Sequence, residues 1–204
     1  MASIRNYTIS SPPEHRDHLE LTIKREEGGF FSQYMHDDLK PGDTVEIQGP
    51  FGTFTSAGEA DGVVLIAGGV GITPFLSIIR HLTAAAWPGA IDLLHAVRSP
   101  ADAIRAEELE RLAREHPRLR IHMFYSEEGL GGSKTGIGRI TASAIRDRVP
   151  GIATRPVYLC GPTAMMRAVA DMLRECGVPT TSLFVESFGE ALTSDQDIAA
   201  TVAR

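Results

Sequence analysis

The chain has 204 residues, of which 43% are hydrophobic, and a formal net charge of −6. This composition is typical of a soluble globular protein with one full domain and a smaller one, and the lack of Lys/Arg clusters argues against nucleic acid or an anionic membrane as a partner. Because no apolar run approaches the roughly 18 residues of a membrane span and the first residues lack a signal-peptide core, a cytoplasmic location is expected.

The amino-terminal part carries the pattern of β structure interrupted by turns. A short helix that has Ser32 near its start suits residues 28–37. Polar–apolar alternation predicts strands over residues 5–11, 19–23 and 44–48. Three strands with open edges make a poor free-standing domain. We therefore expect residues outside this sequence, or another polypeptide, to complete the sheet.

The remainder of the chain alternates apolar strands with amphipathic helices. Its first strand, residues 63–66, passes through a glycine-rich turn into a helix that begins at Pro74, with Thr73 as the expected cap. Strand–helix–strand units of this length predict a parallel sheet covered on both faces. Further strands are expected at residues 91–97, 121–125, 157–160 and 182–186, and further helices over residues 101–115, over residues 141–148 and from Pro162 to Gly177.

Four glycine-rich or polar loops follow the predicted strands. Since the carboxyl ends of parallel strands meet at one edge of a sheet, these loops predict a binding cleft there. In the first loop, Gly69 and Gly71 let the backbone approach a pyrophosphate at the start of a helix. This stretch has Pro74 where the common dinucleotide fingerprint has a small residue, so by itself it is equally compatible with a turn that binds nothing. The loops are residues 68–74, 98–99, 126–127 and 160–162.

Five segments, in order along the chain, resemble the motifs of the ferredoxin-NADP reductase superfamily, especially the reductase parts of flavohaemoglobins and oxygenase systems. They are residues 5–11 (RNYTISS), 29–32 (GFFS), 68–74 (GGVGITP), 160–162 (CGP) and 186–188 (ESF). The resemblance implies an α/β NAD(P)-binding parallel-sheet domain preceded by a partial antiparallel β-barrel flavin-binding domain. The corresponding divisions are residues 1–56 for the barrel, 57–190 for the α/β domain and 191–204 for a linker-like tail.

The resemblance assigns a flavin site to the amino-terminal part. Arg5 matches the arginine that pairs with the flavin phosphate, a task suited to a bidentate guanidinium. Tyr7 would lie against the isoalloxazine ring, and Thr8, where most relatives have serine, keeps the hydroxyl that hydrogen-bonds flavin N5. Without the other motifs, Arg5 and Tyr7 are equally compatible with an exposed cross-strand pair. Gly29 and Ser32 would hold the flavin phosphate at a helix start, and Phe31 is also assigned to the flavin site.

The nicotinamide nucleotide is assigned by the resemblance to the α/β domain. Cys160 matches the cysteine beside nicotinamide C4, Glu186 the carboxylate that tunes proton supply, and Phe188 the aromatic ring that covers the flavin. Free cysteines and phenylalanines are otherwise usually packing residues, which is the interpretation of Cys176. The other residues assigned to the nucleotide are Gly69, Gly71, Thr73, Pro74, Gly161 and Pro162.

Two features point in opposite directions on the choice between NADH and NADPH. Arg98 stands at the end of the second strand of the α/β domain, where an arginine admits a 2′-phosphate. After the third strand, Ser126 and Glu127 stand where NADPH-specific plant-type relatives have Ser-Arg, and a carboxylate there repels a phosphate. NADH is therefore favoured. FAD is expected as the flavin, with FMN left open.

The resulting hypothesis is a flavin-dependent NAD(P)H oxidoreductase that passes hydride from nicotinamide to flavin and then single electrons to an acceptor. The expected acceptor is an iron–sulfur protein or a haem domain, such as a fused ferredoxin module or a separate oxygenase. The alternative is a nucleotide-binding or partner-binding module that has lost flavin chemistry, which the short barrel motivates. No metal site is expected, because the two cysteines are too few and the seven histidines are scattered and interpreted as ordinary surface or core residues.

Overall fold

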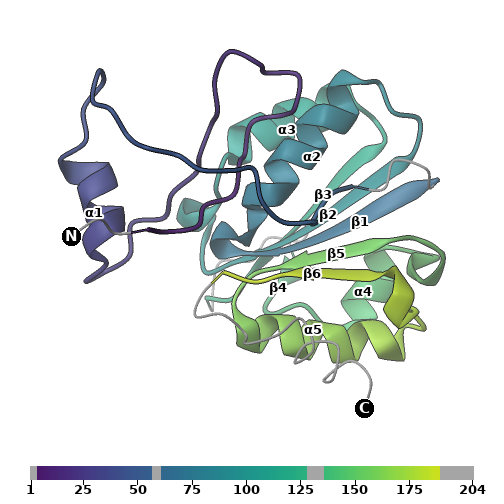
Figure 1. The fold of residues 1–204 in the computed structure, drawn as a ribbon. Coiled ribbons are helices and arrows are strands. Elements are labelled where there is room, and N and C mark those ends of the chain that lie inside the picture. The colour runs from purple at the N-terminus through teal and green to yellow at the C-terminus, as the bar shows by residue number, and fades with distance from the viewer. Residues whose placement is uncertain (1–3, 57–60, 128–135, 189–204) are drawn as a thin grey trace.

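The computed structural model describes residues 4–56, 61–127 and 136–188. At the centre of the protein lies a sheet of six parallel strands in the order β4-β3-β2-β1-β5-β6 (Figure 1). This sheet confirms the α/β parallel fold expected from the alternating pattern. The strands are β1 (Gly62–Gly68), β2 (Ala90–Val97), β3 (Leu119–Tyr125), β4 (Gly136–Ile137), β5 (Val157–Cys160) and β6 (Leu183–Glu186).

Helices cover both faces of the sheet. One face lies under α2 and α3 and the other under α4 and α5, and each face has its own buried apolar cluster (Figure 1). In the described part of the chain, no helix is long and apolar enough to cross a membrane. The helices are α1 (Phe30–Asp37), α2 (Thr73–Ala84), α3 (Ala106–Glu115), α4 (Ala142–Arg148) and α5 (Thr163–Glu175).

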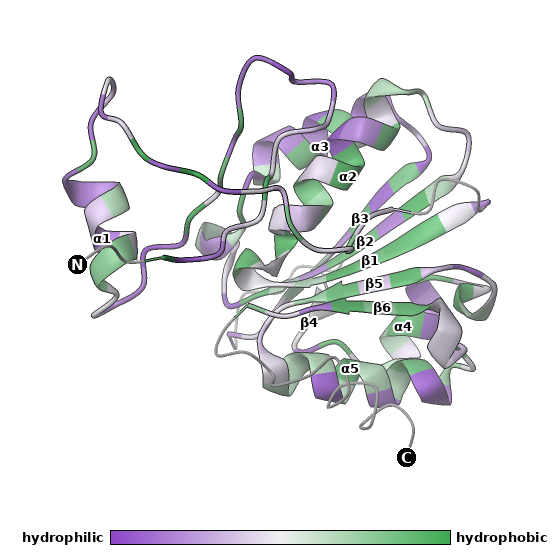
Figure 2. Ribbon diagram, viewed as in Figure 1, coloured by the Kyte–Doolittle hydropathy of each residue, from purple (hydrophilic) through white to green (hydrophobic). Residues whose placement is uncertain are grey.

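β1 is apolar along its length because it lies in the middle of the sheet. Its side chains alternate between the two clusters: Val63 and Leu65 pack on the α2 side, and Val64 and Ile66 pack on the α5 side. All seven residues of β1 are buried. A strand covered on both faces has no polar side to expose, and the hydropathy colouring accordingly shows β1 as hydrophobic along most of its length (Figure 2).

The amino-terminal part departs from the sequence prediction. Residues 4–56 contain no strand, and their one β-bridge joins Ile9 to Leu21 in antiparallel fashion. The strands predicted over residues 5–11, 19–23 and 44–48 are therefore wrong as sheet elements, because a strand needs a neighbour to accept its backbone hydrogen bonds. Ile47 is 58% exposed in one of these extended segments. The predicted short helix, in contrast, is confirmed as α1, with Ser32 buried.

Two predicted helix starts also need correction. The Thr73 side chain does not cap α2, because the chain enters the helix through a 3-10 turn over Gly69–Ile72 and is already helical at Ile72. A capping side chain acts from a non-helical residue. The helix predicted over residues 101–115 begins only at Ala106, because Pro100–Asp102 forms a separate 3-10 turn. The tail predicted over residues 191–204 lies outside the described residues.

The amino-terminal part is fastened to the sheet domain through α2. Arg80 donates hydrogen bonds to the Ser10 carbonyl at 2.7 Å and to the Glu20 carboxylate at 3.2 and 3.3 Å. The same guanidinium reaches Glu108 of α3 at 2.6 and 2.8 Å. Because only 11% of the Arg80 side chain is exposed, these bonds fix residues 10–20 against α2 (Figure 1).

Candidate functional site

The carboxyl edge of the sheet has a switch point beside β1. β1 lies between β2 and β5, and the helices that follow β1 and β5 cover opposite faces of the sheet (Figure 1). In α/β sheets such a point opens a crevice for ligands. The four loops predicted to share this edge follow β1, β2, β3 and β5, which all run parallel.

Two glycine-containing turns touch at this switch point. A Cβ on Gly71 would overlap the Cys160 carbonyl and lie 2.7 Å from the Gly161 nitrogen, and a Cβ on Gly161 would lie 2.9 Å from the Gly68 nitrogen. Packing between the turns therefore requires Gly71 and Gly161 to lack side chains. Gly69 differs, because it has a left-handed φ of +52° and its Cβ would meet no atom within 4 Å. The turn is thus open to a ligand at Gly69.

His95 lies beneath this turn, on β2. Its side chain is fully buried, and Nε2 donates a hydrogen bond to the Gly69 carbonyl at 3.0 Å. Burial lowers the pKa of His95, so the imidazole is neutral near pH 7. Sequence reasoning interpreted His95 as an ordinary residue. The available signal was a histidine near the end of a mostly apolar central strand.

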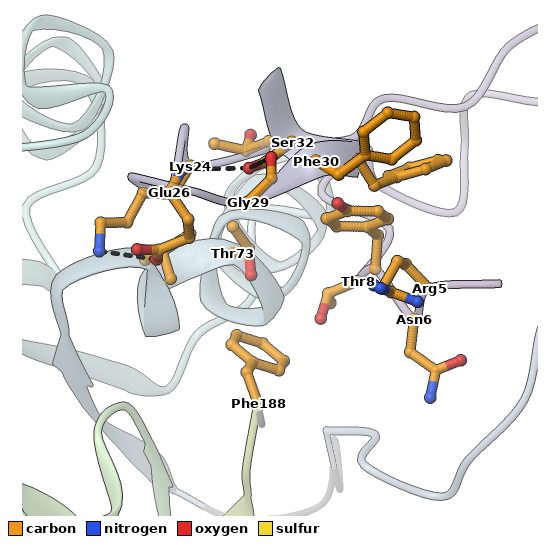
Figure 3. A pocket seen from close by; sticks show the side chains of 14 residues that line it. Arg5, Asn6, Thr8, Lys24, Glu26, Gly29, Phe30, Ser32, Thr73 and Phe188 are labelled. Atoms are coloured by element: carbon orange, nitrogen blue, oxygen red, sulfur yellow. Dashed lines mark hydrogen bonds and ion pairs between the residues drawn. The ribbon is translucent and has the colours of Figure 1, made fainter. Parts of the chain in front are cut away.

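A cavity of about 280 Å³ lies between the amino-terminal part and the sheet domain (Figure 3). Its walls come from the segment around Arg5, from the turn into α1, from the start of α2 and from Phe188 beyond β6. Residues separated by most of the chain thus meet in one place. The predicted site residues that line this cavity are Arg5, Tyr7, Thr8, Gly29, Phe31, Ser32, Thr73 and Phe188.

One end of the cavity has the features of an anion site. α1 begins at Phe30, so the amides of its first turn have no partner within the helix and carry the positive end of its dipole. The side chains of Arg5 and Lys24 line the same cavity, and Lys24 pairs with Glu26 at 2.7 Å (Figure 3). Sequence reasoning missed Lys24 and Glu26, whose only signal was their position just before a double-glycine turn.

The Ser32 hydroxyl is engaged within this turn. It donates to the Gly29 carbonyl at 3.0 Å and accepts the Glu26 N–H at 3.1 Å. A Cβ on Gly29 would lie 2.7 Å from the same Oγ atom. Both residues therefore shape the turn that presents the first amides of α1, while a direct bond from the hydroxyl to a phosphate stays a prediction.

Aromatic rings line another wall of the cavity. The rings of Tyr7 and Phe31 stack with centroids 5.9 Å apart and an interplanar angle of 26°. Burial raises the pKa of the Tyr7 phenol, and the charge of Arg5 opposes this rise only in part, so the phenol stays neutral at physiological pH. Phe188, which is 38% exposed, approaches the cavity from the side of the sheet domain (Figure 3). The arrangement suits a flat, largely apolar ring system with a phosphate at one end.

Cys160 lies in the core beside the rim. It is fully buried at the end of β5, where its strand partner is Glu186. Burial, with a smaller effect of the Glu186 charge, raises the pKa of the Cys160 thiol, so the group is a neutral thiol. The predicted residues that do not line the cavity are Gly69, Gly71, Pro74, Arg98, Ser126, Cys160, Gly161, Pro162 and Glu186.

Arg98, at the end of β2, has two acidic residues near it. Arg98 pairs with Asp102 at 2.9 Å, and this hydrogen bond is the main reason that the pKa of Arg98 is raised. The Glu127 N–H donates to the Arg98 carbonyl at 3.0 Å, which places Glu127 beside it. The Ser126 N–H similarly bonds the Val97 carbonyl at 3.0 Å. The arginine that would admit a 2′-phosphate therefore has two carboxylates nearby.

Two family models match the chain. Residues 65–171 match the oxidoreductase NAD-binding domain, and residues 1–56 match the oxidoreductase FAD-binding domain. A flavohemoprotein from Deinococcus radiodurans is 34% identical over 190 residues, which are 91% of this chain and 47% of the relative. The glycine betaine monooxygenase reductase subunit from Pseudomonas aeruginosa is 35% identical over 188 residues, 91% of this chain and 51% of the relative. The chain thus spans about half the length of the curated relatives it matches.

Solved structures share the arrangement of both parts. The flavohem-like FAD/NAD-binding domain of nitric oxide dioxygenase from Vibrio cholerae matches with a TM-score of 0.84 at 28% identity. That match covers 92% of this chain and 78% of the Vibrio domain. Phthalate dioxygenase reductase, described as a modular structure for electron transfer from pyridine nucleotides to [2Fe-2S], has a TM-score of 0.70 at 28% identity. That match covers 92% of this chain and 54% of the reductase.

Proposed function

Since this chain belongs to the ferredoxin-NADP reductase superfamily, we propose that it is a flavin-dependent NAD(P)H oxidoreductase. The observation that carries the proposal is the cavity, which brings Arg5 and the start of α1 together with the aromatic rings of Tyr7 and Phe188. When bound, the flavin would accept hydride from the nicotinamide and release electrons one at a time. Residues 1–56 would hold the flavin and residues 57–190 the nicotinamide nucleotide.

The residues of the cavity fit a flavin. The guanidinium of Arg5 and the first amides of α1 would bind its phosphate. Tyr7 and Phe31 supply an apolar surface for a planar ring, and the Thr8 hydroxyl offers it a hydrogen bond. Phe188 would cover the opposite face and exclude water. FAD is the favoured flavin because residues 1–56 match an FAD-binding model.

The nicotinamide nucleotide would bind at the switch point. Gly69, with its open side, would approach the pyrophosphate, and Thr73 lies where the turn after β1 meets the flavin cavity. Gly71 and Gly161 would act by letting the two turns pack. We place Cys160 beneath the nicotinamide as a neutral packing group, with Glu186 beside it. Pro74 and Pro162 would stiffen the starts of α2 and α5.

NADH is the favoured donor. Asp102 and Glu127 offset the charge of Arg98, which leaves the arginine poorly placed to accept a 2′-phosphate. A carboxylate also suits the ribose 2′-hydroxyl of NADH. Two relatives bear names that point to haem and to an oxygenase system. We therefore propose a haem or iron–sulfur protein as the electron acceptor, either fused to this chain or separate.

The test is spectroscopic. Purified protein should be yellow or should take up added FAD, and the flavin absorbance should bleach anaerobically on addition of NADH. Extraction and chromatography of the flavin separate FAD from FMN. A protein that binds no flavin under any of these conditions overturns the proposal. Nucleotide binding without flavin uptake would instead support the alternative of a nucleotide-binding module, which the single β-bridge in residues 4–56 favours.

A further inference from the structure

His95 makes one hydrogen bond from a fully buried position. Nε2 donates to the Gly69 carbonyl at 3.0 Å, whereas Nδ1 has no hydrogen-bond partner in the described part of the chain. β2 places His95 in register with Ala67 of β1, on the face of the sheet that packs under α2 and α3. A leucine of similar size would fill this space without burying an unpaired nitrogen. Packing therefore does not account for a histidine here.

The accepting carbonyl belongs to the residue that opens the turn after β1. Gly69 has a left-handed backbone, with φ at +52°, and begins the 3-10 turn over Gly69–Ile72. The peptide bond that joins Gly69 to Val70 is trans. In a trans peptide, the C=O and the following N–H point in opposite directions. Because the Gly69 carbonyl points inward to His95, the Val70 N–H points outward.

The outward side of this peptide faces open space, since a Cβ on Gly69 would meet no atom within 4 Å. Val70 lines the cavity between the two parts of the chain, together with Thr73. Val70 is also one of the first residues of the turn, where amides lack partners within the turn and attract anions. A rotation of this one peptide would turn a donor toward the core and an acceptor toward a phosphate.

We propose that His95 is a positioning residue that fixes the Gly69–Val70 peptide so that the Val70 amide faces the pyrophosphate of the nicotinamide nucleotide. This inference rests on the proposed function, because it assigns the pyrophosphate to the turn after β1. Since a carbonyl only accepts hydrogen bonds, Nε2 carries the proton in this role. His95 itself touches no ligand and acts through the backbone.

Three variants separate this role from a structural one. His95→Leu removes the donor and the unpaired Nδ1, and His95→Gln keeps an N–H close to the position of Nε2. Leu94→Ala is the matched control, because Leu94 is fully buried beside His95 but packs on the other face of the sheet. Calorimetric titration with ADP-ribose, which contains the pyrophosphate without nicotinamide, measures affinity, and thermal denaturation measures stability.

We expect His95→Leu to bind ADP-ribose about tenfold more weakly than the unmodified chain, because it loses one well-aligned bond to a charged group. Its melting temperature should be unchanged or higher, since an unpaired buried nitrogen is gone. His95→Gln should restore affinity to within about threefold, given that a neutral amide donor replaces the imidazole N–H. Leu94→Ala should melt earlier with unchanged affinity.

Equal affinity of His95→Leu and the unmodified chain would overturn the inference. So would a loss of affinity that Leu94→Ala reproduces, since that result would trace the effect to general destabilisation. If His95→Leu does not fold, His95→Gln is compared with the shorter His95→Asn, which does not reach the carbonyl, and equal affinities of these two would overturn it. Failure of the unmodified chain to bind either ADP-ribose or NADH is a different result, because it contradicts the proposed function itself.

Discussion

A side chain on Gly71 would overlap the carbonyl group of Cys160, because the turns after β1 and β5 are in contact at this point. The obstacle is backbone, which cannot move aside as a flexible side chain does. We expect Gly71→Ala to lower the free energy of unfolding by about 3 kcal/mol through overpacking. By separating the turns it should also weaken NADH binding. Chemical denaturation and an NADH titration measure the two effects.

Gly69→Ala is the matched control for this prediction. Its Cβ meets no atom within 4 Å, although φ is +52°. The substitution should therefore cost only the penalty of a left-handed backbone, about 1 kcal/mol. An equal loss of stability in the two variants would show that contact between the turns is not what requires glycine at position 71.

Arg5 should control flavin affinity. It lines the cavity to which the turn into α1 also contributes, so a phosphate bound between them would meet both the guanidinium and the helix dipole. Loss of a charge-assisted hydrogen bond to a phosphate predicts that Arg5→Ala weakens FAD binding about tenfold or more. Quenching of flavin fluorescence on titration measures the dissociation constant. Arg16 is an exposed arginine outside the cavity, so Arg16→Ala should bind FAD normally; equal weakening in both variants would contradict an Arg5 phosphate site.

Arg80 should couple the amino-terminal part to the sheet domain. Its bonds to Ser10, Glu20 and Glu108 join three segments through one little-exposed guanidinium. Removal of these charge-assisted bonds in Arg80→Ala should cost about 2 kcal/mol. In this variant, amide hydrogen exchange should become faster in residues 8–23 while β1 stays protected. The affinity for FAD should fall as well.

The control for Arg80 is an exposed arginine pair. Arg111 pairs with Glu115 in α3 and is 52% exposed, so Arg111→Ala should change stability by less than about 0.5 kcal/mol. Unchanged exchange in residues 8–23 of Arg80→Ala would mean that other contacts hold the amino-terminal part in place.

The α/β half of the fold was predictable because its signals are local. The apolar run of β1 and the helical spacing of Met166, Val169 and Leu173 each depend on nearby residues only. The amino-terminal part was not predictable in the same way, because alternation indicates an extended segment but not its partner. Ile9 forms a single antiparallel β-bridge with Leu21. Within residues 4–56, the other extended segments pair with no strand.

The candidate site was predictable only in part for a related reason. Tyr7, Phe31 and Phe188 were identified through the order of motifs, and the fold then brought them to one cavity. Nothing in the sequence indicated that His95 would reach the carbonyl of Gly69, 26 residues before it. Such a contact depends on the register between β1 and β2, which a single sequence does not determine.

Asp92 should make stability depend on acid pH. Its fully buried carboxylate accepts hydrogen bonds from Arg120 at 2.6 Å, Arg155 at 2.7 Å and His122 at 3.3 Å. Burial acts to raise the pKa of Asp92, but these bonds outweigh it and hold the pKa at about 2, below the ordinary 3.8. A lowered carboxyl pKa stabilises the fold above the pKa of the unfolded chain, and this contribution is lost as pH falls through about 2.

Asp92→Asn tests this cluster. At pH 7 it should destabilise by about 3 kcal/mol, because it leaves Arg155 buried without its charge partner. The difference in free energy of unfolding between Asp92→Asn and the unmodified chain should shrink by about 2 kcal/mol between pH 5 and pH 2, because Asp92 itself becomes neutral over this range. Urea denaturation of both proteins across this range measures the difference. Asp171, 59% exposed and paired with Arg174, is the control, and Asp171→Asn should cost less than about 1 kcal/mol at every pH. A pH-independent difference for Asp92→Asn would contradict the low pKa.

Glu127 should determine the preference for NADH over NADPH. It lies beside Arg98, whose guanidinium already pairs with Asp102 at 2.9 Å, so two carboxylates lie near the place where a 2′-phosphate would bind. Glu127→Arg reverses this charge and should raise affinity for NADPH about tenfold while weakening NADH binding slightly. Glu175→Arg makes the same change of charge at the other end of α5, about 20 Å from the rim by helix length, and should alter neither affinity. Anaerobic titration of each variant with both nucleotides measures the ratio of the NADPH affinity to the NADH affinity. Because simple attraction of anions would raise NADPH affinity in both variants alike, only a change confined to Glu127→Arg places the 2′-phosphate at the end of β2.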